Sequence, residues 1–176
     1  MLTDVLQGYG ARVAALASAT AGLDTLRTSH YDVALCDLWM PDMDGFAFIR
    51  SVRAQADRRL AALPAAAITA SGLSDDQDRA LKEGFSAHLQ KPVDPRELAA
   101  AVLALADLLI SVDTSVVHLA GALGREAWVV LPFAPDWRWT LTNERSPWYP
   151  QARLFRQRAP GDWPNVIATV RDALRT

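Results

Sequence analysis

Three polar residues each stand at the end of a short apolar segment of the sequence. Asp37, Thr69 and Lys91 close segments that we expect to be successive strands of a parallel sheet. Because the carboxyl ends of parallel strands meet at one edge of a sheet, their side chains should lie close together. A carboxylate, a hydroxyl and an ammonium in one crevice suit phosphoryl transfer, in which Asp37 attacks, Lys91 pairs with the transferred oxygens and Thr69 hydrogen-bonds one of them. For any one of these residues alone, capping of the sheet is the commoner interpretation.

A second set of polar residues lies where an expected strand at 108–112 runs directly into a helix. Asp113, Thr114 and Ser115 occupy the turn, and His118 lies on the first turns of the helix. Backbone N–H groups at a helix start, with hydroxyls beside them, form an anion site. The pattern is weak by itself because Thr and Ser cap many helices that bind nothing, and His118 is equally compatible with a packed helix residue.

Strands and helices alternate along the chain, which predicts an α/β fold: a doubly wound parallel sheet, flavodoxin-like or Rossmann-like, in three α/β/α layers. We expect strands at 12–16, 32–36, 65–69, 87–90, 108–112, 127–131 and 153–155. We expect helices at 19–28, 45–56, 75–83, 95–106, 115–123 and 164–174. The stretch 132–150, rich in Trp and Pro, is expected to be a long packed loop.

The composition is that of a globular protein, with 51% hydrophobic residues, 22% charged residues and a net charge of −2 over 176 residues. This charge gives no general attraction to nucleic acid or to an anionic membrane. The longest apolar run, about 98–112, contains Asp107 and is shorter than the ~20 residues that span a bilayer. Cys36 is the only cysteine and no basic leader precedes residues 2–6, so we expect a cytoplasmic protein without nucleic-acid or membrane partners.

Residues 2–105 closely resemble the response-regulator receiver family. The matching sequence motifs are CDLWMPDMDG at 36–45, ITASG at 68–72 and HLQKPVDP at 88–95. The resemblance implies that Asp37 is the phosphoacceptor, Thr69 the switch hydroxyl and Lys91 the phosphate-pairing lysine. It also implies that the backbone carbonyl of Trp39 binds Mg²⁺, and that a histidine kinase or a small phosphodonor is the partner. His88 falls where the family has its switch aromatic residue, although a strand histidine packed against a helix fits the position as well.

Receivers begin with a central strand that ends in two adjacent acids, which hold the Mg²⁺. This chain begins about where the following helix is expected, at 2–6, so we expect both acids to be missing. Mg²⁺ binding should then be weak, and phosphotransfer impaired or lost. The strands at 12–16 and 32–36 would flank an empty slot, and their unpaired edges would permit oligomers.

Residues 106–172 closely resemble the C-terminal end of glycosyltransferases with two Rossmann domains, related to the heptosyltransferases and often attached to tetratricopeptide repeats. The matching sequence motifs are SVDTSVVHLAGALG, WVVLPFAPDWRW, SPWYP, RLFRQ and PGDW. The resemblance implies that Asp113, Thr114, Ser115 and His118 line a site for a nucleotide diphosphate-sugar. Glycosyl transfer itself is not expected, because the acceptor domain and the first half of the donor domain are not present.

Segments 1–105 and 106–176 each supply half a sheet, and we expect them to form one domain. In one arrangement, strand 108–112 fills the empty slot and places Asp113 beside Asp37 as a further metal ligand. In the other, it extends the edge beyond 87–90. Two families joined without a linker indicate a chimera. The sequence thus favours a receiver-like domain, with a nucleotide-sugar binding module and a structural chimera without ligand or activity as alternatives.

Overall fold

The computed structural model describes residues 2–41, 43–70 and 74–175, and the chain divides into two compact units, Met1–Ala106 and Asp107–Thr176. Three residues of the receiver-like sequence motifs, Asp42, Ser71 and Gly72, lie outside the described residues. The elements of the first unit are α1 (Leu2–Gly8), α2 (Ala19–Thr28), β1 (Ala34–Asp37), α3 (Gly45–Arg53), α4 (Arg58–Ala61), β2 (Ala65–Thr69), α5 (Ser74–Glu83), β3 (Ala87–Gln90) and α6 (Pro95–Leu105). Those of the second are β4 (Leu109–Val112), α7 (Ser115–Ala122), β5 (Ala127–Leu131), a 3₁₀ turn η1 (Trp137–Trp139), β6 (Ala152–Arg156) and α8 (Trp163–Ala173).

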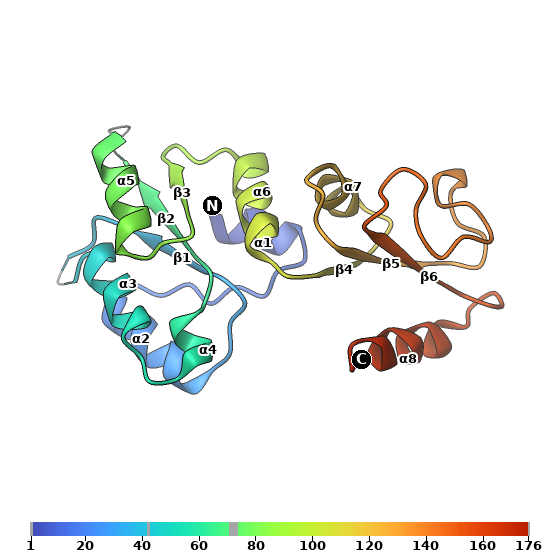
Figure 1. Ribbon diagram of the computed structural model, residues 1–176, viewed down its shortest axis with the longest axis horizontal. Coiled ribbons are helices and arrows are strands. Elements are labelled where there is room, and N and C mark those ends of the chain that lie inside the picture. The colour runs from blue at the N-terminus through green and yellow to red at the C-terminus, as the bar shows by residue number, and fades with distance from the viewer. Residues whose placement is uncertain (1, 42, 71–73, 176) are drawn as a thin grey trace. The chain divides into compact units, whose positions relative to one another are not determined.

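The first unit contains a parallel sheet with strand order β1-β2-β3 (Figure 1). All five residues of β2 are buried, as expected for a central strand covered on both faces. β2 and β3 lie at the positions that the sequence predicts. β1 was predicted at 32–36 and lies at Ala34–Asp37, so it ends one residue later than predicted.

Helices cover both faces of this sheet. Neighbouring strand residues point to opposite faces, so Cys36 packs with Phe46 and Ile49 of α3, whereas Leu35 packs with Leu6 and Leu98 of α1 and α6. The first unit is therefore a three-layer α/β/α sandwich, as the sequence predicts.

The strand predicted at 12–16 is wrong. In the structure these residues form no ladder; Val13 packs against the α1 and α6 face, while Leu16 is 48% exposed. A strand needs a neighbour for its N–H and C=O groups, and none of the described residues provides one here. The apolar pattern of this segment reflects a single packing contact rather than a place in the sheet.

The second unit has a parallel sheet of its own, with order β4-β5-β6. α7 lies on one face and α8 on the other (Figure 1); Trp128 and Val130 of β5 pack with Val166 and Val170 of α8. The expectation that strand 108–112 fills a slot beside β1 is wrong, because β4 pairs with β5 in a separate sheet. It does not extend the sheet at β3 either, since the first sheet ends at β3 and β4 belongs to the sheet β4-β5-β6.

The middle of the Trp- and Pro-rich stretch after β5 is held by the guanidinium of Arg156. Nη2 of Arg156 donates to the carbonyl oxygens of Trp139 and Thr140, both at 2.9 Å, and Trp139 is fully buried. Thr140 has a φ of 57°, a conformation that costs energy for a β-branched residue. Trp139 and Ser146 are buried, but most of 132–150 is exposed, including Phe133, Trp137, Leu141 and Trp148 at 48 to 74%. The prediction of a packed loop is therefore wrong for most of this stretch, which is held at a few buried residues only. Among the described residues of the chain, no helix is long and apolar enough to cross a membrane.

Candidate functional site

Asp37 and Lys91 form an ion pair at the carboxyl edge of the first sheet. Nζ of Lys91 donates to Oδ2 of Asp37, and the backbone N–H of Trp39 donates to Oδ1 at 3.2 Å. Both oxygens of the carboxylate therefore have a partner. The pair is partly open to solvent, with the Lys91 side chain 43% exposed and the Asp37 side chain 32% exposed, so a small molecule can approach it.

Thr69 lies between these two residues in the order of the strands. It ends β2 and is fully buried, and its carbonyl oxygen accepts a hydrogen bond from the backbone N–H of Lys91 at 2.7 Å. The three residues thus end neighbouring strands at one edge of the sheet, and the ion pair joins the side chains of Asp37 and Lys91. The predicted role of the Thr69 hydroxyl stays a prediction.

The turn after β1 is tight because Gly45 lies directly against it. A Cβ atom at residue 45 would lie 2.7 Å from the carbonyl oxygen of Asp37 and 2.9 Å from Cα of Leu38. Oδ1 of Asp44 accepts from the N–H of Ala47 at 2.7 Å and so caps α3. The glycine and the cap together fix where β1 ends, and with it the position of the Asp37 carboxylate.

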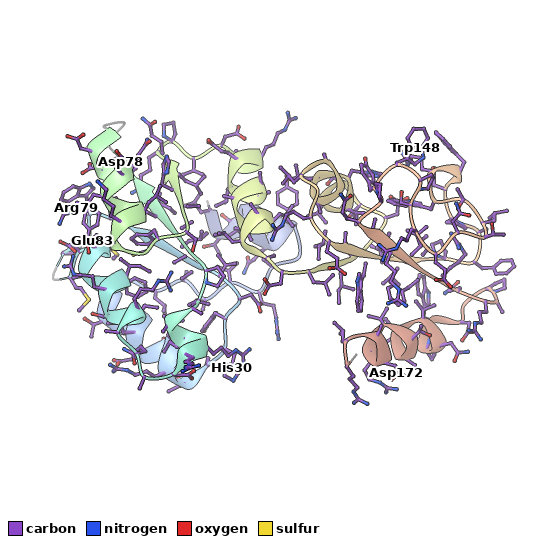
Figure 2. The ribbon with its side chains drawn as sticks, viewed as in Figure 1. His30, Asp78, Arg79, Glu83, Trp148 and Asp172 are labelled. Carbon is purple, nitrogen blue, oxygen red and sulfur yellow. The ribbon has the colours of Figure 1, made fainter. Side chains whose placement is uncertain are left out.

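The indole of Trp39 lies beside the same turn. Its ring packs edge-on against Phe46 at a centroid distance of 6.4 Å and is 56% exposed. The guanidinium of Arg79, which Figure 2 shows on α5, lies 4.0 Å from the centre of the Phe46 ring on which Trp39 packs. His88 lies in β3, opposite Ala67 of β2, and is half-buried. Its predicted switch role stays a prediction.

Cys36 precedes Asp37 and points into the core. Burial, with the negative charges of Asp37 and Asp44 nearby, raises the pKa of the Cys36 thiol from 9.0 to about 12. The thiol is therefore protonated at neutral pH and makes an unreactive packing contact in this unit.

The second unit gathers Asp113, His118, Tyr149 and Trp139 around one imidazole. Nε2 of His118 lies 3.4 Å from Oδ1 of Asp113, and Nδ1 lies 3.2 Å from the Tyr149 hydroxyl. The imidazole also stacks on the indole of Trp139, with ring centroids 5.4 Å apart. The sequence predicted Asp113 and His118 here, but the places of Tyr149 and Trp139 are set by a loop whose path has no periodic signal.

Thr114 and Ser115 are less directly involved. The Thr114 hydroxyl lies 3.2 Å from that of Ser111, and Thr114 makes no side-chain cap bond to α7. Ser115 is exposed at the first position of that helix. Of the four residues predicted to bind a diphosphate, the structure joins Asp113 to His118 and leaves the other two beside them at the helix start.

The donors at Asp37 suit a hard cation in type, because Mg²⁺ prefers carboxylate and carbonyl oxygens with water. Asp113, predicted as a further ligand, belongs to the sheet of the second unit, so its expected place on a strand next to β1 is wrong. In residues 2–41, 43–70 and 74–175, no group of three or more His, Cys, Asp or Glu residues gathers in a metal-binding arrangement. The carboxylate of Asp37 is a suitable donor for a cation here, and the predicted role of the Trp39 carbonyl stays a prediction.

A parallel sheet covered on both faces, with an aspartate and a lysine paired at its carboxyl edge, defines the first unit as a flavodoxin-like α/β domain. Comparison with known proteins identifies the family. The chain belongs to the response regulator receiver domain family, whose model matches residues 1–103. The matched residues end just before the second unit, so the glycosyltransferase resemblance of 106–172 stays a prediction.

Individual relatives agree with this family. The sensor protein GacS of Pseudomonas syringae pv. syringae is 32% identical over 104 residues, which are 58% of this chain and 12% of GacS. An uncharacterized 14.6 kDa protein of Leptolyngbya boryana is 38% identical over 98 residues, or 56% of this chain and 73% of that protein. The chain therefore spans only a small part of the sensor kinase that it matches, and most of the cyanobacterial protein.

Solved structures support the same fold. The receiver domain of the sensor histidine kinase PA1611 from Pseudomonas aeruginosa, which holds a magnesium ion in its active site cleft, has a TM-score of 0.54 and 28% identity over 59% of this chain and 84% of that one. The chemotaxis response regulator CheY4 of Vibrio cholerae has a TM-score of 0.55 and 26% identity over 60% of this chain and 86% of its own. The predicted doubly wound fold is confirmed for the first unit.

Proposed function

We propose that the first unit accepts a phosphoryl group on Asp37, at a rate limited by weak Mg²⁺ binding. A carboxylate oxygen of Asp37 attacks phosphorus, the bond from phosphorus to the leaving group breaks, and the electron pair departs with that group. The product is an acyl phosphate on Asp37. Lys91 then pairs with the transferred oxygens, and the Thr69 hydroxyl hydrogen-bonds one of them.

The weak Mg²⁺ binding follows from the partners that Asp37 already has. Mg²⁺ would be held by the Asp37 carboxylate and the Trp39 carbonyl, and when bound it would neutralise charge in the transition state. Lys91 already pairs with Oδ2 of this carboxylate, so its positive charge opposes a second cation beside the same group. Competition with an ammonium lowers the affinity of a site for a cation.

Two kinds of phosphodonor fit this site, a phosphohistidine of a histidine kinase and a small acyl phosphate. Both present a good leaving group on an accessible phosphorus, and the Asp37 carboxylate is partly exposed. The resemblance to the sensor protein GacS supports the first donor. A reducing, cytoplasmic setting is also proposed, since the single cysteine is a buried free thiol.

The Asp37–Lys91 ion pair is the observation that carries this proposal, and mass spectrometry of the intact chain tests it. With Mg²⁺ and acetyl phosphate, the chain should gain the mass of one phosphoryl group, and the gain should be lost on treatment with hydroxylamine, which cleaves acyl phosphates. Asp37→Asn should not gain this mass. Asp32→Asn, an exposed aspartate just before β1, is the matched control; if both variants are labelled alike, Asp37 is not the acceptor.

A second function is proposed for residues 107–176, that of a binding module for a nucleotide diphosphate-sugar. It is favoured by the His118 imidazole, which is oriented by Asp113 and Tyr149 at the end of β4, where an α/β sheet binds its ligands. Calorimetry with nucleoside diphosphates tests it, with His118→Gln as the variant that should lose the heat of binding. An absence of heat at millimolar ligand, together with no label on Asp37, would leave the chain as a structural chimera without ligand.

A further inference from the structure

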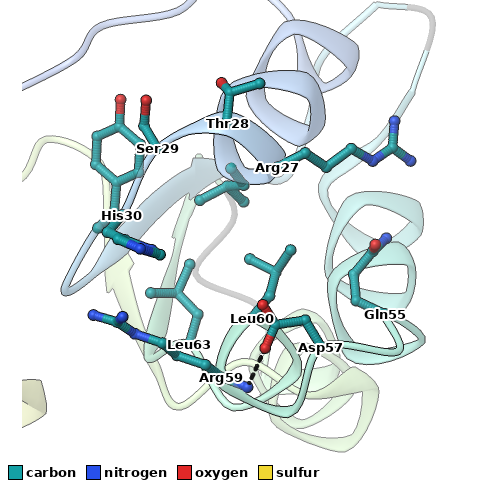
Figure 3. A pocket seen from close by; sticks show the side chains of 11 residues that line it. Arg27, Thr28, Ser29, His30, Gln55, Asp57, Arg59, Leu60 and Leu63 are labelled. Atoms are coloured by element: carbon teal, nitrogen blue, oxygen red, sulfur yellow. Dashed lines mark hydrogen bonds between the residues drawn. The ribbon is translucent and has the colours of Figure 1, made fainter.

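A cavity of about 400 Å³ lies beside the residues that lead into β1 (Figure 3). Asp37 lies at the other end of this strand. Its walls come from the end of α2, the connection 29–31 and the region around α4. The volume is within the range of about 300 to 1,000 Å³ that is typical of small-molecule sites. All of its lining residues belong to the first unit, so the cavity is defined without reference to the second.

The floor of the cavity is apolar. Leu26, Leu60 and Leu63 line it; Leu63 is 5% exposed, and Leu26 packs on the core between α2 and α3. Because Leu26 and Leu63 are fixed by their packing against the protein, the apolar surface is formed before any ligand binds. An aryl or alkyl group would gain the usual free energy of apolar burial there.

One side of the cavity is cationic. Figure 3 shows the imidazole of His30 and the guanidinium of Arg59 on the same side, next to the leucine floor. The backbone N–H of Arg59 donates to Oδ1 of Asp57 at 2.8 Å. Among the described residues, no carboxylate forms an ion pair with the guanidinium of Arg59. On the opposite wall Arg27 is neutralised by Asp24, at 3.1 Å. The Asp57 carboxylate also lines the cavity, so the positive charge is local to the side of Arg59 and His30 and is not an excess over the whole lining.

We propose that this cavity binds a small organic anion: a carboxylate or a similar head group at Arg59 and His30, joined to one apolar arm that lies on Leu26, Leu60 and Leu63. The guanidinium supplies two parallel N–H donors for a planar anion, and His30 adds a ring nitrogen beside them. A purely apolar ligand would leave this edge unused, and a dianion without an apolar arm would leave the floor bare.

The cavity is separate from the predicted phosphoacceptor. Its residues 29–31 precede β1, whereas Asp37 ends it, so the two lie at opposite ends of one strand. Occupancy can therefore be measured in the unphosphorylated chain, and the outcome does not depend on whether Asp37 accepts a phosphoryl group.

The test uses the full chain, 3-phenylpropionate as the anionic probe and 3-phenylpropanol as its neutral counterpart, followed by amide chemical shifts. Saturable shifts confined to residues 26–31 and 55–63 are expected with the carboxylate. Arg59→Gln should weaken its binding about fivefold or more, as loss of a charged hydrogen bond does at a partly exposed site. Arg58→Gln is the matched control, because Arg58 is exposed on the same turn of α4 and does not line the cavity.

Three results would overturn the proposal. The first is an absence of saturable shifts at a probe concentration on the order of 10 mM. The second is equal affinity for the acid and the alcohol. The third is an equal loss of affinity in the Arg59→Gln and Arg58→Gln variants. His30→Gln provides an independent check. It should weaken the carboxylate more than the alcohol, and its own spectrum reports whether the fold is intact.

Discussion

The ammonium of Lys91 is paired with the carboxylate of Asp37 across the end of β2, although the two residues are 54 positions apart in the chain. The pairing is produced by the order of the strands, because β1 and β3 flank β2 and both end at its carboxyl edge. The ion pair therefore depends on the parallel arrangement of the three strands and not on any local sequence pattern.

Lys91→Met should separate the two roles of this ammonium. Removal of the positive charge should raise the affinity of Asp37 for Mg²⁺ by about threefold to tenfold. It should also slow labelling by acetyl phosphate by about tenfold or more, because the transferred oxygens lose their partner. Mg²⁺ titrations and labelling rates measure the two effects. The other lysine, exposed Lys82 on α5, is the control, and a Lys82→Met variant with the same profile would contradict the assignment.

Gly45→Ala should destabilise the first unit. The new methyl group would lie 2.7 Å from the Asp37 carbonyl oxygen, so the turn must open, at a cost of about 1 to 3 kcal/mol. Gly8→Ala is the control, because nothing lies within 4 Å of a Cβ atom there, and it should change stability by no more than about 0.5 kcal/mol. Hydrogen exchange of residues 1–106 in increasing urea measures both. Equal protection in the two variants would show that the turn yields freely.

Arg53 and Arg50 lie on the same helix and should differ sharply in their contribution to stability. Arg53 donates to the carbonyl oxygens of Gly84, Ala61 and Leu63 at 2.7 to 2.9 Å, and partial burial lowers the pKa of its guanidinium. Arg53→Met should cost about 2 kcal/mol or more, since several acceptors lose their donor. Arg50 forms an exposed ion pair with Glu83 at 3.0 Å, and Arg50→Met should cost less than about 1 kcal/mol. Urea unfolding compares the two.

The parts of this fold that the sequence predicts well are those set by local pattern. The strands at 65–69, 87–90 and 127–131 have the predicted bounds, because each is an apolar run with a clear stop. Asp94 caps α6 through its Oδ1, as the Asp-Pro pair indicates. The alignment of Asp37, Thr69 and Lys91 then follows from the parallel arrangement.

The parts that the sequence does not predict depend on distant partners. Segment 12–16 has the composition of a strand, but none of the residues that the structure describes pairs with it. Strand 109–112 joins β5 rather than β1. Tyr149 reaches His118 from 31 residues away along an irregular loop. In each case hydrogen-bond partners and packing decide the outcome, and neither is encoded in a local pattern.

Alkaline pH should destabilise the first unit through Cys36. The folded state raises the pKa of this thiol to about 12 from 9.0, so the stabilisation is complete below about pH 9 and is lost as the pH rises toward 12. Between about pH 8 and 10, the free energy of unfolding should fall by about 1.4 kcal/mol from this group. Cys36→Ala lowers the starting stability but should remove this part of the slope. Equal slopes in both proteins would show that the thiol ionises without unfolding.

In the second unit, Gly121→Ala should act through Tyr149. A Cβ atom at residue 121 would lie 2.4 Å from the Tyr149 ring, so the ring must move and its hydroxyl must leave His118. Tyr149→Phe removes only the hydroxyl and should cost about 1 kcal/mol, whereas Gly121→Ala should cost more. In a Tyr149→Ala background the same glycine change should cost almost nothing, because the atom that it meets is gone. Hydrogen exchange of residues 107–176 measures the stability of the four proteins in this double-mutant cycle. If Gly121→Ala lowers stability equally with and without the Tyr149 ring, Gly121 is needed for the helix itself and not for contact with the ring.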